Sequence, residues 1–162
     1  SSAEPNLPFV EPSSSLTPVQ LVGANGAFWA AGSGVLFLDE LGELPLRTLE
    51  CLRKPMEAMW NRDAPPTPLV VGATNPCPCG FKGHEALDCS CSASRVARYQ
   101  ERFSAPFMDR FQVALALDMR EERSPVPWEE LAFKLRHAVE LQRSRGPWLG
   151  NAAMPMESRV VG

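Results

Sequence analysis

The hydrophobic positions of the chain include two short continuous runs, each long enough for one strand. Val35–Leu38 is an apolar run that ends directly before Asp39 and Glu40. A run without polar alternation is typical of a strand buried on both faces of a parallel sheet, so we expect such a strand here. Residues 69–73 have the same character and predict a second strand. A third strand is predicted at residues 111–117.

Apolar residues at helical spacing follow the first two predicted strands. One set begins after Pro45, which suits the opening turn of a helix, and Pro55 is expected to kink or end it. The next set follows Ser92, which can cap a helix, and carries arginines on another face. A further helix is predicted from Trp128, after a linker at residues 121–127. Strands that alternate with helices indicate the α/β class, followed by a small helical unit.

Two other segments have the composition of loops. Residues 1–26 are rich in proline, serine, asparagine and glycine and have few regularly spaced apolar positions, so we expect them to be mostly loop. Residues 61–68, with the sequence NRDAPPTP, are interpreted as a linker between the first predicted helix and the second strand.

The composition is that of an ordinary globular protein. The chain has 162 residues, of which 44% are hydrophobic and 22% charged, enough for one domain with a small appendage. No apolar run approaches the roughly 20 residues that cross a bilayer, and residues 1–15 lack an export signal. We therefore expect no membrane contact and a cytoplasmic location. The net charge of -3 gives no overall electrostatic case for binding nucleic acid.

Polar residues at the ends of the first two predicted strands are candidates for chemistry, because α/β proteins bind ligands at the carboxyl ends of their strands. Asp39 and Glu40 resemble the Walker B element of P-loop ATPases, in which one acid organises Mg²⁺ and the next polarises the attacking water. The alternative is a solvated acidic turn. Thr74 and Asn75 can hold a water near a γ-phosphate, and an ordinary Asn-Pro turn is the alternative for them.

Four of the five cysteines form two CxC pairs within a cysteine-rich insert at residues 77–91. Without a secretory signal, these thiols are interpreted as reduced ligands, and four thiolates suit structural Zn²⁺ in a tetrahedral site. Free or redox-active thiols are the alternative, and His84 is a competing ligand. Cys51 lies in a predicted helix and is interpreted as a packing residue. The predicted metal ligands are Cys77, Cys79, Cys89 and Cys91.

Three segments occur in an order that resembles one protein family. They are GVLFLDEL at residues 34–41, ATNPCPCG at residues 73–80 with a later CSC, and RYQERFSAPFMDRF at residues 98–111. Over about residues 7–151 the chain resembles the ComM branch of the magnesium-chelatase-related AAA+ ATPases. The resemblance implies an incomplete P-loop NTPase fold and a hexameric ring that uses ATP and Mg²⁺ and moves branched DNA.

The resemblance also implies roles for two residues and a division of the chain. Asn75 matches the sensor-1 position, and Arg110 matches the arginine finger that reaches the ATP of a neighbouring subunit. Taken alone, Arg110 is better explained as a partner of Asp109 or as a solvated charge. Residues 1–120 would form a partial ATPase core, and residues 121–162 would begin the helical lid.

The chain departs from the family pattern in several places. The printed sequence has no G-x-x-x-x-G-K-[ST] phosphate-binding loop, which we expect before residue 1, and we expect the lid arginine of relatives after residue 162. Ser13 and Ser14 stand where relatives carry a His pair, and residues 61–68 replace a DNA-contacting β-hairpin. Because nothing else would hold the phosphates, the isolated chain is expected to be inactive.

Three interpretations follow. The preferred one is a partial AAA+ ATPase core from a ComM-type DNA motor. A fragment of a magnesium chelatase ATPase subunit is the alternative among enzymes, although the cysteine pairs are not expected there. A non-catalytic, zinc-stabilised assembly module is the alternative outside enzymes.

Overall fold

A computed structural model describes residues 7–58, 65–117 and 126–144 of the chain. The chain divides into two compact units, Ser1–Phe111 and Gln112–Gly162. The predicted domain boundary between residues 120 and 121 lies outside the described residues. Within the described ranges, every helix is too short or too polar for a membrane span.

The first unit is built on a parallel sheet of three strands, β1 (Phe9–Val10), β2 (Val35–Leu38) and β3 (Leu69–Gly72). The order is β1-β2-β3, so β2 is the central strand. Leu36 is paired with Val10 on one side and with Val70 on the other. The α/β class and the first two predicted strands are therefore confirmed.

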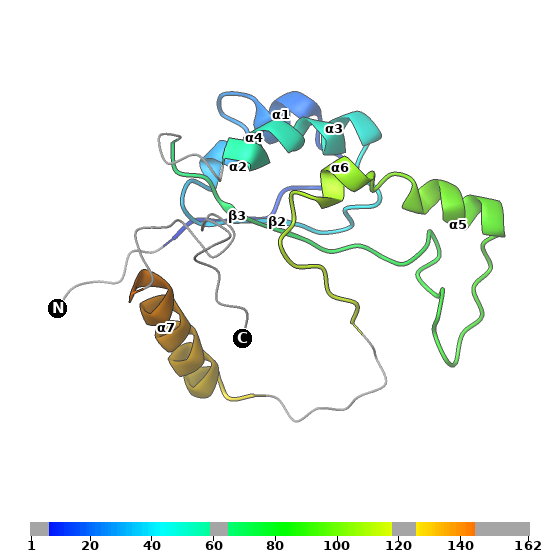
Figure 1. The fold of residues 1–162 in the computed structure, drawn as a ribbon. Coiled ribbons are helices and arrows are strands. Elements are labelled where there is room, and N and C mark those ends of the chain that lie inside the picture. Colours follow the sequence, from blue (N-terminus) through cyan, green and yellow to red (C-terminus); the bar gives the residue numbers. More distant parts are fainter. Residues whose placement is uncertain (1–6, 59–64, 118–125, 145–162) are drawn as a thin grey trace. The chain divides into compact units, whose positions relative to one another are not determined.

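The two faces of β2 differ in burial. Leu36 and Leu38 are 0% and 2% exposed, because the helices α1 to α4 pack on their side of the sheet (Figure 1). Val35 and Phe37, on the opposite face, are only partly buried, and the ring of Phe37 stacks on Phe9. The prediction of a strand buried on both faces is wrong for this second face.

Four short helices cover the buried face of the sheet. They are α1 (Pro18–Val22), α2 (Ala27–Ala30), α3 (Leu46–Cys51) and α4 (Arg53–Ala58). The prediction that residues 1–26 are mostly loop is confirmed for residues 7–26, although the short elements β1 and α1 lie among them. The buried side chains that these helices contribute to the core are Leu21, Phe28, Leu49 and Met56.

The break between α3 and α4 falls at Leu52, three positions before Pro55. Pro55 is the third residue of α4, where a backbone N–H would have no partner within the helix, so the proline is tolerated. The prediction that Pro55 kinks or ends the helix is met only as a break one turn before it, because α4 continues past Pro55 to Ala58.

Two further helices complete the described part of the first unit, α5 (Ala93–Gln100) and α6 (Ala105–Met108). The predicted cap of α5 is confirmed, since Ser92 Oγ accepts a hydrogen bond from the backbone N–H of Arg95 at 3.3 Å. Phe107 of α6 is fully buried in the core of the unit.

In the second unit the structure describes residues 112–117 and α7 (Trp128–Ser144). The predicted helix from Trp128 is confirmed. The predicted strand at residues 111–117 is wrong, because these residues are irregular and no described segment pairs with them. Leu115 and Leu117 are 80% and 91% exposed.

Candidate functional site

The carboxyl ends of β2 and β3 meet at one edge of the sheet, and polar side chains follow both strands. Hydrogen bonding continues past the strands, since Ala73 N donates to Leu38 O at 2.9 Å and Leu41 N donates to Ala73 O at 2.8 Å. Residues 39–40 are therefore held beside Ala73, which leads into Thr74 and Asn75, and Asp39, Glu40, Thr74 and Asn75 are all exposed. We call these four residues the acidic edge.

Glu40 has an unusual backbone. Its φ is 49°, and it is the non-glycine residue with a positive φ among the described residues. Its backbone N–H donates to Asp39 Oδ1 at 2.8 Å, and its carbonyl accepts from Glu43 N at 2.7 Å. The left-handed conformation costs a residue with a side chain about 1–2 kcal/mol. Strain of this kind is more typical of functional sites than of plain solvated turns.

Helix α5 contacts the loops after both strands. The hydroxyl of Tyr99 lies 3.0 Å from Thr74 Oγ1, and the Tyr99 side chain is buried. Gly42, just beyond the acids, is so close that an added Cβ would lie 1.9 Å from this hydroxyl. Gln100 Nε2 also donates to Pro76 O at 3.3 Å. Tyr99 therefore contacts the segments that follow both strands, at Thr74 and near Gly42.

Sequence reasoning assigns no site role to Tyr99, which occurs there only within the family segment at residues 98–111. The pair Gly42 and Tyr99 has no local signal, because the two positions are distant in the chain and meet only in the folded unit. The glycine after two acids is the one hint that the backbone there is approached closely.

Arg110 is held elsewhere in the unit. Its guanidinium forms an ion pair with Glu57 of α4, and not with Asp109, its alternative partner from the sequence. Its Nε is buried and has no hydrogen-bond partner among the described residues. The described hydrogen bonds thus place Asp39 and Glu40 beside Ala73, two residues before Asn75, while Arg110 is tied to α4.

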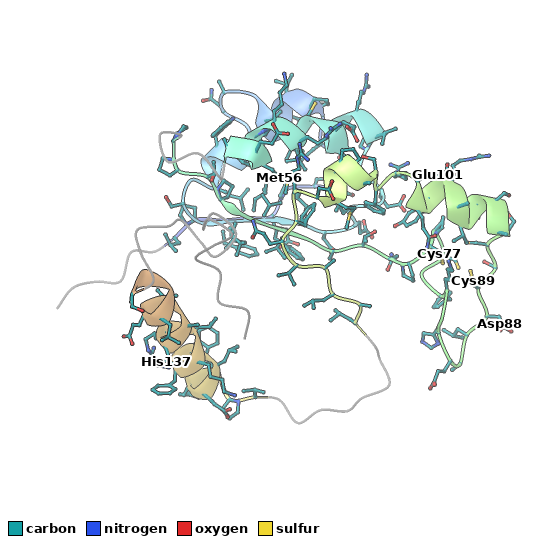
Figure 2. The ribbon with its side chains drawn as sticks, viewed as in Figure 1. Met56, Cys77, Asp88, Cys89, Glu101 and His137 are labelled. Atoms are coloured by element: carbon teal, nitrogen blue, oxygen red, sulfur yellow. The ribbon has the colours of Figure 1, made fainter. Side chains whose placement is uncertain are left out.

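The four predicted metal ligands form a cluster in the loop between β3 and α5. Cys77 and Cys89 approach from the two arms of this loop (Figure 2), with 3.6 Å between their sulfurs. The sulfur of Cys79 lies 3.4 Å from that of Cys77 and 3.5 Å from that of Cys89. All four sulfurs, including that of Cys91, lie within 4.8 Å of one another, and all four thiols are free.

The thiols of the cluster differ in acidity. The pKa of Cys79 is lowered to about 5, first by a hydrogen bond from the backbone of Phe81. The pKa of Cys89 is raised to about 12, because burial and the neighbouring thiols outweigh a backbone hydrogen bond at Cys91 that lowers it. Cys79 is therefore a thiolate near neutral pH, the form in which cysteine binds metals.

Comparison with known proteins agrees with this architecture. Residues 2–124 match the family model described as magnesium chelatase, subunit ChlI. The curated proteins that are similar to the chain include three from different bacteria. An uncharacterized protein of Mycobacterium tuberculosis is 37% identical over 124 residues, the uncharacterized protein YifB of Escherichia coli 34% over 126, and the competence protein ComM of Haemophilus influenzae 32% over 130.

These matches cover 68%, 69% and 72% of this chain but only 24%, 24% and 25% of the three relatives. The chain thus spans about a quarter of the length of the relatives that it matches. The family match, the relatives and the parallel sheet with its acidic edge together show that the chain belongs to the magnesium chelatase ChlI family, with YifB and ComM among its relatives.

Proposed function

We propose that the chain forms the hydrolytic part of a ComM-type AAA+ ATPase core, from a motor that couples ATP hydrolysis to the movement of DNA. The observation that carries this proposal is the acidic edge, where hydrogen bonding past β2 and β3 holds the segment with Asp39 and Glu40 beside Ala73, which leads into Thr74 and Asn75. The strained backbone of Glu40 supports a chemical role at the same place.

Three members of the acidic edge, Asp39, Glu40 and Asn75, each have one proposed task. Asp39 holds Mg²⁺ on the phosphates of ATP, and a bound Mg²⁺ would neutralise charge that develops on them. Glu40 acts as the base that polarises the attacking water, and Asn75 holds that water. All three side chains need access to a ligand, and all three are exposed.

Arg110 is proposed to act on ATP bound by a neighbouring subunit. In the described unit it is paired with Glu57, so it must exchange this carboxylate for a phosphate when subunits meet. Glu57 is 52% exposed, and such a surface pair contributes only about 0–1 kcal/mol, so the exchange is inexpensive. The proposed partners are further copies of the chain, in a hexameric ring, and DNA, with the cytoplasm as the proposed location.

The chain alone is proposed to be inactive in ATP hydrolysis. Within the printed residues no G-x-x-x-x-G-K-[ST] segment supplies the backbone amides and lysine that hold the β- and γ-phosphates. The test therefore uses a version joined to such a loop. In that protein, Glu40→Gln should lower the turnover of ATP by about 10²–10⁴-fold while leaving the affinity for ATP nearly unchanged.

Glu43→Gln is the matched control, because Glu43 is an exposed acid three positions later in the same turn. Its turnover should equal that of the parent. Equal turnover in the Glu40→Gln variant would remove Glu40 as the base. Mg²⁺-dependent hydrolysis by the unmodified 162-residue chain would show that a phosphate site exists within it.

A zinc-stabilised assembly module without catalysis is a second proposed function, and the cysteine cluster favours it. One simple observation distinguishes the two proposals. A phosphate-binding loop encoded upstream in the same reading frame supports the ATPase, and an upstream frame without it supports the assembly module.

A further inference from the structure

The cysteine cluster lies outside the proposed ATP chemistry, and its geometry matches one class of ligand. The three closest sulfur pairs are separated by 3.4, 3.6 and 3.5 Å. Four sulfurs at about 2.3 Å from a tetrahedral Zn²⁺ are about 3.8 Å apart, whereas the sulfurs of a disulfide are about 2.05 Å apart. The cluster therefore has the spacing of a metal site and not of two disulfides.

The backbone around the cysteines also suits a metal site. Gly80, directly after Cys79, has a φ of 83°, and its N–H donates to Cys77 O at 3.0 Å, which closes a tight turn. Beyond this turn, backbone N–H groups of Phe81 and Lys82 donate to the sulfurs of Cys79 and Cys77. Hydrogen bonds of this kind orient the ligands and stabilise thiolates around an ion.

His84, the competing ligand suggested by the sequence, is engaged elsewhere. Its Nδ1 accepts hydrogen bonds from the backbone N–H groups of Ala86 and Leu87 at 3.1 and 3.2 Å. Its ring packs edge-on against Phe81. Among the described residues, the group of potential ligands that gathers here consists of cysteines alone. Four sulfur ligands favour Zn²⁺ over the hard cations Mg²⁺ and Ca²⁺.

The position of the cluster in the chain gives the ion a structural task. Cys77 and Cys79 follow the end of β3, and Cys91 directly precedes Ser92, the cap of α5. Bound metal would therefore cross-link the end of a strand to the start of the next helix. The other end of α5 contacts the same segment after β3, where Tyr99 contacts Thr74 and Gln100 contacts Pro76.

Asn75 lies directly against this cross-linked loop. An added Cβ on Gly80 would be 3.9 Å from Asn75 Cγ and Oδ1, so the turn between the cysteines borders the Asn75 side chain. We propose that Cys77, Cys79, Cys89 and Cys91 bind one Zn²⁺ that clamps α5 to the end of β3 and so fixes Asn75 and Tyr99. The site stands independently of ATP, because none of the four thiols takes part in hydrolysis.

The first experiment measures metal in the 162-residue chain purified under reducing conditions. Elemental analysis should find about one Zn²⁺ per chain, and Co²⁺ added to metal-free protein should give the absorption of a tetrahedral thiolate site. Cys51→Ser is the matched control, since Cys51 lies on α3 outside the cluster, and it should retain both signals. Cys89→Ser should lose the stoichiometric Zn²⁺. Unmodified protein that binds neither ion would overturn the proposal, and this result does not depend on whether a variant folds.

The second experiment tests the clamp by hydrogen exchange of the unmodified chain with and without a chelator. Removal of Zn²⁺ should raise the exchange of residues 73–76 and 93–100 at least tenfold, while residues 18–31, in α1 and α2, change little. An equal change in both regions, or none in either, would contradict a local clamp even if zinc is bound. No nucleotide is present in these measurements, so a failure here is distinct from a failure of the proposed ATPase.

Discussion

Glu40 shows at the scale of one residue how the proposed chemistry opposes stability. Its φ of 49° is the conformation that glycine adopts without steric penalty. A carboxylate is nevertheless present, and its N–H is held by Asp39 Oδ1. The position therefore retains an acid at a cost to the fold, which is understandable if the acid is needed for function.

This conflict can be measured with two substitutions at the same position. Both Glu40→Gly and Glu40→Ala remove the carboxylate, but only alanine keeps a Cβ in the left-handed region. The glycine variant should therefore have the higher free energy of unfolding, by about 0.5–1 kcal/mol after its greater chain entropy is counted. Urea denaturation of both variants gives this difference. If the alanine variant is as stable as the glycine variant, the backbone at residue 40 is not strained in solution.

Residues with local signals could be predicted from the sequence. Asp39 directly follows one apolar run and Asn75 stands two positions after the other, so their place after the ends of parallel strands follows from the chain itself. The cysteine pairs were found by their spacing. The contact of Tyr99 with Gly42 and the pairing of Arg110 with Glu57 were not predictable, because each joins residues that only tertiary packing brings together.

At the scale of elements, α1 is stabilised by a signal that a search for apolar periodicity does not detect. Thr17 and Gln20 form a capping box, in which Thr17 N donates to Gln20 Oε1 at 2.9 Å and Gln20 N donates to Thr17 Oγ1 at 3.3 Å. Pro18 occupies the first helical position. The sequence TPVQ contains this signal.

By contrast, residues 111–117 have strand-forming residues but no described neighbour to pair with, and propensity alone does not form a sheet.

Removal of the capping hydroxyl should destabilise the first unit measurably. Thr17→Ala leaves the N–H of Gln20 without its acceptor and should lower the free energy of unfolding by about 1 kcal/mol. Thr17→Ser keeps an acceptor at the same place and should stay within a few tenths of a kcal/mol of the parent. Thermal denaturation followed by circular dichroism compares the three proteins. Equal loss in both variants would mean that the methyl group of Thr17, and not its hydroxyl, stabilises α1.

At the scale of the whole molecule, the proposed role of Arg110 requires two copies of the chain. The experiment uses the version joined to a phosphate-binding loop and mixes two inactive parents, Arg110→Ala and Glu40→Gln. Loss of an arginine finger lowers turnover by about 10³–10⁵-fold, so each parent should be nearly inactive. Mixed assemblies contain interfaces with one intact acid and one intact arginine, and they should regain part of the ATPase rate.

A third variant, Glu57→Gln, tests the ion pair that holds Arg110 in the described unit. It removes the carboxylate that pairs with Arg110 in the described unit and leaves the guanidinium in place, so its ATPase rate should match or exceed that of the parent. Mixed oligomers that form but regain no activity would assign Arg110 to its own subunit, with Glu57 as a structural partner.

The less covered face of the sheet has a practical consequence for work with the purified chain. Within the first unit, Phe9, Leu69 and Val71 remain 63%, 55% and 38% exposed, and the outer edge of β3 pairs with no described strand. Apolar surface beside an open strand edge favours association between copies. The average molar mass of stored samples, measured by light scattering, should therefore rise with protein concentration at temperatures well below the thermal transition. Val71→Lys should suppress this rise, whereas Val19→Lys, at an exposed position on α1, should not. With this outcome, association through the less covered face, and not unfolding, limits the time for which the purified chain stays monomeric.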